Sequence, residues 1–98
     1  MKELIVPPEV ETDPNALEIA RIWVAHKAQH VSLNTGPWEK APAGWGIMLC
    51  DLARHVANAY EQGGHGKAHD IFNSIVDMFN AEANSPTDEV AGILVSKH

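Results

Sequence analysis

The sequence is short of basic residues, of cysteine and of long apolar runs, and each shortage excludes a class of function. Seven basic against thirteen acidic residues give the chain a net charge of −6, so it has no basic patch to displace counterions from nucleic-acid phosphates. A single cysteine, Cys50, cannot form an internal disulfide, which favours a reducing, cytoplasmic compartment. No run reaches the roughly 20 apolar residues of a membrane span, and residues 1–14 do not resemble a signal peptide. We therefore expect neither nucleic acid nor membrane as a partner.

The composition is that of a small globular protein. With 98 residues and 45% hydrophobic residues, the chain is expected to form a single domain over residues 1–98. Residues 1–12 are expected to be an extended arm or an edge strand, and residues 84–98 a tail or a short strand. A chain of this size has little core to spare, so we expect a homodimer that adds buried surface.

Apolar spacing predicts three helices. The main one covers residues 43–60, where apolar side chains recur every three or four residues and Gly63-Gly64 supplies a stop. Residues 67–83 repeat the pattern, and residues 14–30 are expected to form a helix that is apolar on more than one side. Residues 31–35 are expected to form a short strand. The predicted class is α+β, predominantly helical, with three helices and two or three short strands in one layer.

The first turn of the main helix contains two glycines, Gly44 and Gly46, on either side of Trp45. Glycine weakens a helix by up to about 1 kcal/mol relative to alanine, so a local interaction should offset this cost. One interpretation is that bare backbone N–H groups let a ligand approach the helix N-terminus. The other is tight packing of this turn against Trp38 or a neighbouring helix.

A candidate ligand site follows if the strand at 31–35 leads into the loop before the main helix. Aromatic walls and a few polar groups would then gather near the N-terminus of that helix, a mixture typical of small-ligand sites. It is equally typical of the capped end of a small core. The candidate ligand-binding residues are Asn34, Thr35, Trp38, Trp45, Gly46, Asp51 and His55.

Two residue pairs raise the question of metal binding or catalysis. His26 and His30 are four apart, as metal-binding histidines on a helix are, but a zinc site generally needs a third protein ligand. They are weak candidates, and partly buried, hydrogen-bonded histidines are the simpler interpretation. Asp51 and His55 form half of an acid/base arrangement with no nucleophile nearby in the sequence. We therefore predict no catalytic residue, no metal site and no cofactor.

Several sequence segments resemble a small family of uncharacterised, mainly proteobacterial proteins of about this length. The resemblance runs from Leu4 to about Phe79 and implies a domain of unknown function, without an activity to carry over. The segments with the most specific resemblance are His30-Val31-Ser32-Leu33, Gly36, Trp38, Trp45-Gly46-Ile47, Asp51 and Arg54-His55.

These observations favour a non-enzymatic cytoplasmic module that binds a small ligand or a protein partner and forms a homodimer, through helix 14–30 or through strand edges. The alternative is a small metal-dependent or hydrolase-like enzyme that uses Asp51, His55 and His30. Shared chemistry would require these three side chains to lie within about 3–4 Å of one another.

Overall fold

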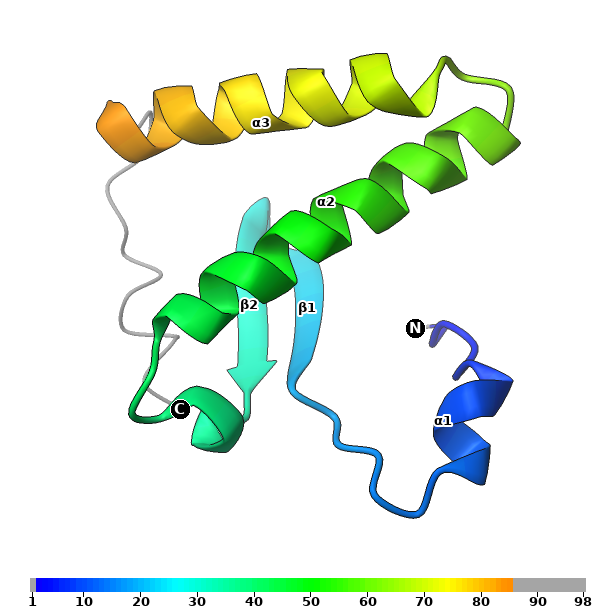
Figure 1. Cartoon of the computed structure of the whole chain (residues 1–98), viewed down its shortest axis with the longest axis vertical. Coiled ribbons are helices and arrows are strands. Elements are labelled where there is room, and N and C mark those ends of the chain that lie inside the picture. Colours follow the sequence, from blue (N-terminus) through cyan, green and yellow to red (C-terminus); the bar gives the residue numbers. More distant parts are fainter. Residues whose placement is uncertain (1, 86–98) are drawn as a thin grey trace. The chain divides into compact units, whose positions relative to one another are not determined.

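The computed structural model describes residues 2–85, and their contacts divide them into two compact units. We call residues 2–35 the β-hairpin unit and residues 36–85 the helical unit, and each is described by itself. The elements in chain order are α1 (Pro8–Thr12), β1 (Ala20–Ala25), β2 (Ala28–Leu33), the 3-10 helix η1 (Gly36–Trp38), α2 (Ala43–Gln62) and α3 (Ala68–Asn84) (Figure 1). The predicted class, α+β with helices dominating, is confirmed. That residues 1–98 form a single domain stays a prediction.

The helical unit follows the sequence pattern closely. The helices predicted at 43–60 and 67–83 are confirmed as α2 and α3, which run side by side from a short turn (Figure 1). Gly63 ends α2, and Gly64 takes a positive φ of 78°, which a side chain would resist. Ala57 is buried, with 1% of its surface exposed. Small residues at such a position let two helices approach closely, so we infer that Ala57 lies in the contact between α2 and α3.

The helix predicted at residues 14–30 is wrong. This stretch contains β1, and β2 begins before it ends, with Ile22 paired to Val31 and Trp23 to His30 in antiparallel register. β-branched side chains stabilise such cross-strand pairs, and this pairing outweighed the helical pattern. The turn between the strands, His26-Lys27, has two positive φ angles of 52° and 61°.

The segment before β1 also differs from its prediction. The Asp13 carboxylate accepts a hydrogen bond from the backbone N–H of Asn15 at 2.8 Å and so closes a local turn where the helix predicted at 14–30 was expected to begin. No strand forms over residues 2–12, where α1 is found instead. The strand predicted at 31–35 exists as β2 with earlier bounds, Ala28–Leu33. The strand or tail predicted within residues 84–98 lies, from residue 86 onward, outside the described residues.

Candidate functional site

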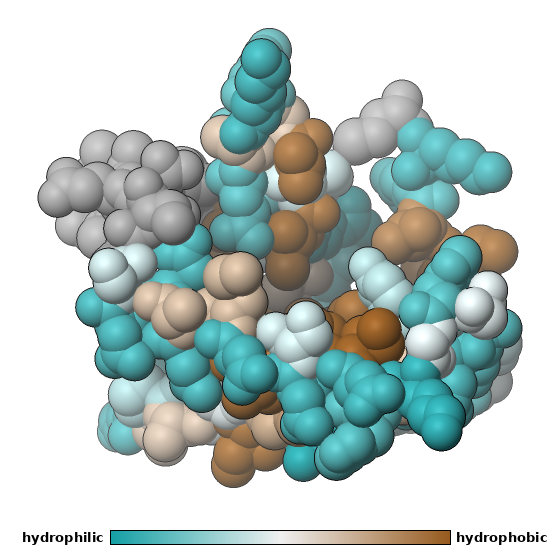
Figure 2. All heavy atoms as spheres, turned by 90° about the horizontal axis from the view of Figure 1, so that it is seen from above, coloured by the Kyte–Doolittle hydropathy of each residue, from teal (hydrophilic) through white to brown (hydrophobic). Residues whose placement is uncertain are grey.

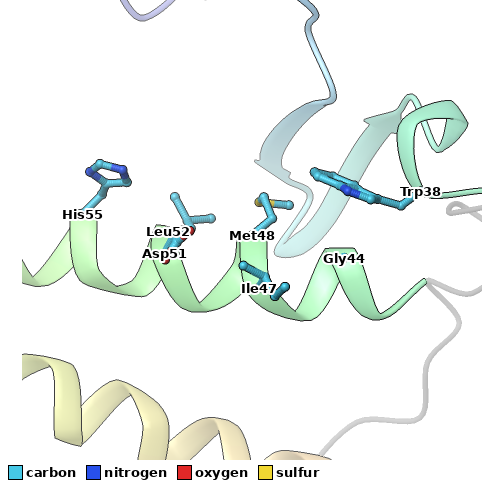
Figure 3. Close-up of a pocket in the computed structure, with 7 residues that line it drawn as sticks. All are labelled: Trp38, Gly44, Ile47, Met48, Asp51, Leu52 and His55. Carbon is cyan, nitrogen blue, oxygen red and sulfur yellow. The ribbon is translucent and has the colours of Figure 1, made fainter. Parts of the chain in front are cut away.

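A groove of about 370 Å³ follows α2 in the helical unit. Six of its lining residues recur at three- and four-residue intervals, so they share one side of the helix, and Trp38 of η1 covers the N-terminal end (Figure 3). Most of the lining is apolar, and the polar groups are two side chains toward the C-terminal end. The lining residues are Trp38, Gly44, Ile47, Met48, Asp51, Leu52 and His55.

The position of Trp38 depends on the glycine beneath it. The Cγ and Nε1 atoms of the indole lie 2.6 Å from the place that a Cβ of residue 44 would occupy, so no larger residue fits there without moving the ring. Trp45 contacts the same indole edge to face, with the ring centroids 5.1 Å apart. Tight packing against Trp38 is therefore confirmed at Gly44. It does not extend to Gly46, because nothing lies within 4 Å of the place a Cβ would take there.

The polar end of the groove carries one carboxylate and one imidazole. The Asp51 carboxylate lies 3.7 Å from the Arg54 guanidinium, which is longer than a good hydrogen bond. Arg54 has other partners, because it donates a hydrogen bond to the Cys50 sulfur at 3.2 Å and lies over the Phe72 ring, 4.8 Å from its centroid. Asp51 is exposed and only loosely paired, so it remains able to accept a hydrogen bond from a ligand.

The structure brings together some of the predicted ligand-binding residues. Trp38, Asp51 and His55 line the groove, and Trp45 lies outside the lining but contacts Trp38. Gly46 lies on α2 outside the lining. Their binding role stays a prediction.

The remaining two predicted residues belong to the β-hairpin unit. Asn34 and Thr35 follow the end of β2, where the backbone N–H of Asn34 donates to the Ile19 carbonyl oxygen at 2.9 Å. The groove is complete without them, since all of its lining residues come from the helical unit.

The prediction missed the apolar floor of the groove. Met48 and Leu52 were not among the candidate ligand-binding residues, and Ile47 was named only in the family resemblance. Their spacing relative to Asp51 and His55 was a usable signal, because residues at i, i+3, i+4 and i+7 share one side of a helix.

The histidine pair considered for metal binding does not have the expected geometry. His26 lies in the hairpin turn, and the Nε2 of His30 on β2 donates to the Ala25 carbonyl oxygen at 3.0 Å. The helical spacing assumed for them is therefore wrong. Within residues 2–85, no three His, Cys, Asp or Glu side chains are grouped so that they could hold a metal ion.

A second, more polar hollow lies on α3. Its residues include two carboxylates seven positions apart, Asp70 and Asp77, with Asn73 and Ser74 between them. The Asn73 amide is hydrogen-bonded to the His69 ring at 3.2 Å. Carboxylates on an exposed helix are ordinary for an acidic protein, and none of the residues that line this hollow is aromatic.

Comparison with known proteins adds a family and a fold relative. Residues 3–87 match the family model described as "Domain of unknown function (DUF5076)". A solved structure described as a "putative pyruvate dehydrogenase", from the photosynthetic bacterium Rhodopseudomonas palustrus CGA009, is similar with 31% sequence identity and a TM-score of 0.71. The match covers 93% of this chain and 92% of that chain. No curated protein matches the sequence. Within residues 2–85, each helix is too short or too polar to serve as a membrane span.

Proposed function

The chain belongs to the family of the domain of unknown function DUF5076, and we propose that it is a non-enzymatic module that binds a small, largely apolar molecule in the α2 groove. The observation that carries the proposal is the placement of Trp38 across Gly44, which gives an otherwise shallow helix surface an aromatic wall. Met48 and Leu52 supply the apolar floor. The groove volume of about 370 Å³ lies within the range of ligand pockets, on the order of 300–1,000 Å³.

The charge of the groove indicates what the ligand should carry. Its one formal charge is the Asp51 carboxylate, which is loosely paired with Arg54. An indole face also attracts cations. We therefore infer a ligand with an aromatic or aliphatic body and a protonated amine or another hydrogen-bond donor, and an anionic ligand would be disfavoured.

We also place this module in a bacterial cytoplasm. The half-buried Cys50 is a free thiol in the described part of the chain, which supports a reducing compartment. The description of the similar structure contributes no residue role to the proposal.

The experiment compares two probes that share a phenyl ring and differ in charge, phenethylamine and phenylacetate, by ligand-observed NMR titration of the full chain. We expect phenethylamine to bind more tightly, with about a tenfold preference if its ammonium group reaches the Asp51 carboxylate. Asp51→Asn should remove the preference. Asp77→Asn makes the same change in net charge in the hollow on α3, outside the groove, and should retain it.

Two results would contradict the proposal. Equal affinity for both probes would mean that Asp51 does not select the ligand. An equal loss in the two variants would mean that the net charge of the protein, and not the groove, attracts the amine.

One observation favours the alternative, a small metal-dependent or hydrolase-like enzyme: Asp51 and His55 line the same groove. No hydrogen bond between their side chains is found among the described residues, and none of the seven lining residues is a serine, threonine, cysteine or lysine. His30 belongs to the β-hairpin unit.

Hydrolysis of p-nitrophenyl acetate distinguishes the two functions. The binding module should show no more hydrolysis than the background expected of its surface imidazoles, and His55→Gln should change the rate no more than His69→Gln does. A rate well above that background, lost only in His55→Gln, would replace the proposed function with the enzyme.

A further inference from the structure

The helical unit carries an apolar face that is distinct from its contact between α2 and α3. On α2, apolar side chains recur at intervals of four, three and four residues, and α3 repeats the same intervals. The α2 row is Trp45, Leu49, Leu52 and Val56, and the α3 row is Ile71, Ile75, Met78 and Glu82. This is the heptad spacing with which helices pack as knobs into holes. We call these two rows the heptad face.

The two rows lie on the same side of the helical unit. Each row is offset by about a quarter turn from the line along which the helices meet, which passes through Ala57 on α2 and Phe72 on α3. Because the two helices are antiparallel (Figure 1), equal offsets bring both rows to one face. Only Glu82, at the end of the α3 row, carries a charge.

This face is partly open: three of its residues are exposed, and the other five, Trp45, Val56, Ile71, Ile75 and Glu82, are half-buried. Met78 is 65% exposed, and Leu49 and Leu52 are each exposed by about two fifths of their surface, 42% and 41%. Figure 2 shows apolar side chains open on the surface of the molecule. Ala57 is the one fully buried hydrophobic residue within residues 2–85. A pair of helices with so little core is stabilised when its heptad rows pack against further helices.

We propose that the heptad face is the interface of a homodimer, in which two copies of the helical unit pack face to face as a four-helix bundle. The spacing argues for a second copy, because both helices already present the rows that such a bundle requires and a two-fold axis repeats them. This surface replaces the interface predicted through a helix at 14–30, a helix that does not exist.

The area of the face reaches the lower limit for a specific dimer interface. α3 has 17 residues, so it is about 25 Å long, and two helices side by side are about 20 Å wide. Each copy therefore contributes a flat footprint on the order of 500 Å². The uneven surface of the side chains adds to this area. Two copies reach about 1,000 Å², which is the lower bound for a specific interface.

Sedimentation equilibrium of the untagged full chain tests this interface. The wild-type chain should be a dimer, and Met78→Glu should weaken the dimer at least 100-fold, because it places an unpaired carboxylate in the apolar interface. Met78 is exposed in the single copy, so the variant should keep its helices, as circular dichroism would report. Asn80→Glu, two positions along α3 and off the heptad face, adds the same charge and should remain dimeric.

Leu49→Glu provides a second substitution from the other helix and should also dissociate the dimer. A wild-type chain that sediments as a monomer would overturn the proposal. So would a dimer that survives both Met78→Glu and Leu49→Glu with wild-type affinity, since another surface would then hold it. The heptad face and the α2 groove share Leu52, but neither Met78→Glu nor Leu49→Glu changes a residue that lines the groove, so the ligand titration stays a separate test.

Discussion

The two units illustrate different relations between sequence and stability. The β-hairpin unit contains a two-stranded sheet in which Val24 is 82% exposed, and its strands are joined by a turn that two ordinary side chains must strain to form. The helical unit has well-punctuated helices, a buried contact point at Ala57 and the candidate groove. An isolated two-stranded hairpin is marginally stable in water. The comparison indicates that the helical unit is the better ordered of the two by itself, and it also carries the two surfaces that we propose for ligand and dimer.

The largest effect should come from overpacking the helical unit. Ala57→Leu inserts three carbons where almost no surface is exposed, and it should lower the free energy of unfolding by about 1–3 kcal/mol. Urea unfolding at fixed protein concentration measures this. Ala81→Leu, the same substitution at an exposed position of α3, should be nearly neutral. Equal effects at both positions would mean that Ala57 does not lie in the contact between α2 and α3.

The next effect concerns the hairpin turn. The double variant His26→Asn/Lys27→Gly should stabilise the hairpin by about 1–2 kcal/mol, because Asn-Gly accepts two positive φ angles with little strain. Amide hydrogen exchange of β1 and β2 reports the change. Ala28→Gly places glycine at the start of β2, where φ is ordinary, and should weaken the hairpin. A loss of protection in the double variant would show that the turn is not of this type.

Replacing each of the two glycines of α2 by alanine should change the stability less, and the two changes should have opposite signs. Gly46→Ala should stabilise the protein by up to about 1 kcal/mol, because the added methyl group meets no atom and the helix gains propensity. Gly44→Ala should destabilise it and change the fluorescence of Trp38, because the methyl group displaces the indole. Thermal unfolding of both variants gives the comparison. A stabilising Gly44→Ala would mean that the indole does not rest on this residue.

The smallest effect is expected at the ion pair of the β-hairpin unit. The pKa of the Arg21 guanidinium is raised, chiefly by its hydrogen bond to Glu18 at 2.8 Å, then by the charges of Glu18 and Glu3. Because the pKa of Arg21 is raised, the stabilisation from its pair with Glu18 is present at neutral pH. It is lost only when the pH rises through the pKa of Arg21, far above neutral. Both side chains are exposed, so Arg21→Gln should leave Tm unchanged across neutral pH and with added salt. A pH-dependent loss near neutral pH would contradict this.

The sequence was sufficient to predict the helical unit because local and tertiary signals agree there. The apolar period of α2 ends where Gly63 and Gly64 begin, and α3 repeats the pattern. In the β-hairpin unit neither the apolar pattern nor the turn residues indicated a hairpin. β1 is apolar on both faces, which resembles a helix that is covered on more than one side, and His26-Lys27 has none of the residues that mark a hairpin turn.

The candidate site was only partly predictable. Aromatic and polar residues near the start of α2 indicated Trp38, Asp51 and His55, and all three line the groove. That Trp38 rests on Gly44 and leaves Gly46 free depends on the course of the chain through η1. Neither spacing nor composition contains that information.

The most direct test of the binding function uses the tryptophans of the two units. Titration of ¹⁵N-labelled protein with phenethylamine, followed through the indole N–H signals and assigned with Trp38→Phe, compares Trp38 of the helical unit with Trp23 of the β-hairpin unit. We predict a saturable shift of the Trp38 signal and a smaller shift of its neighbour Trp45. A saturable shift at Trp23 with Trp38 unmoved would contradict the assignment of binding to the α2 groove.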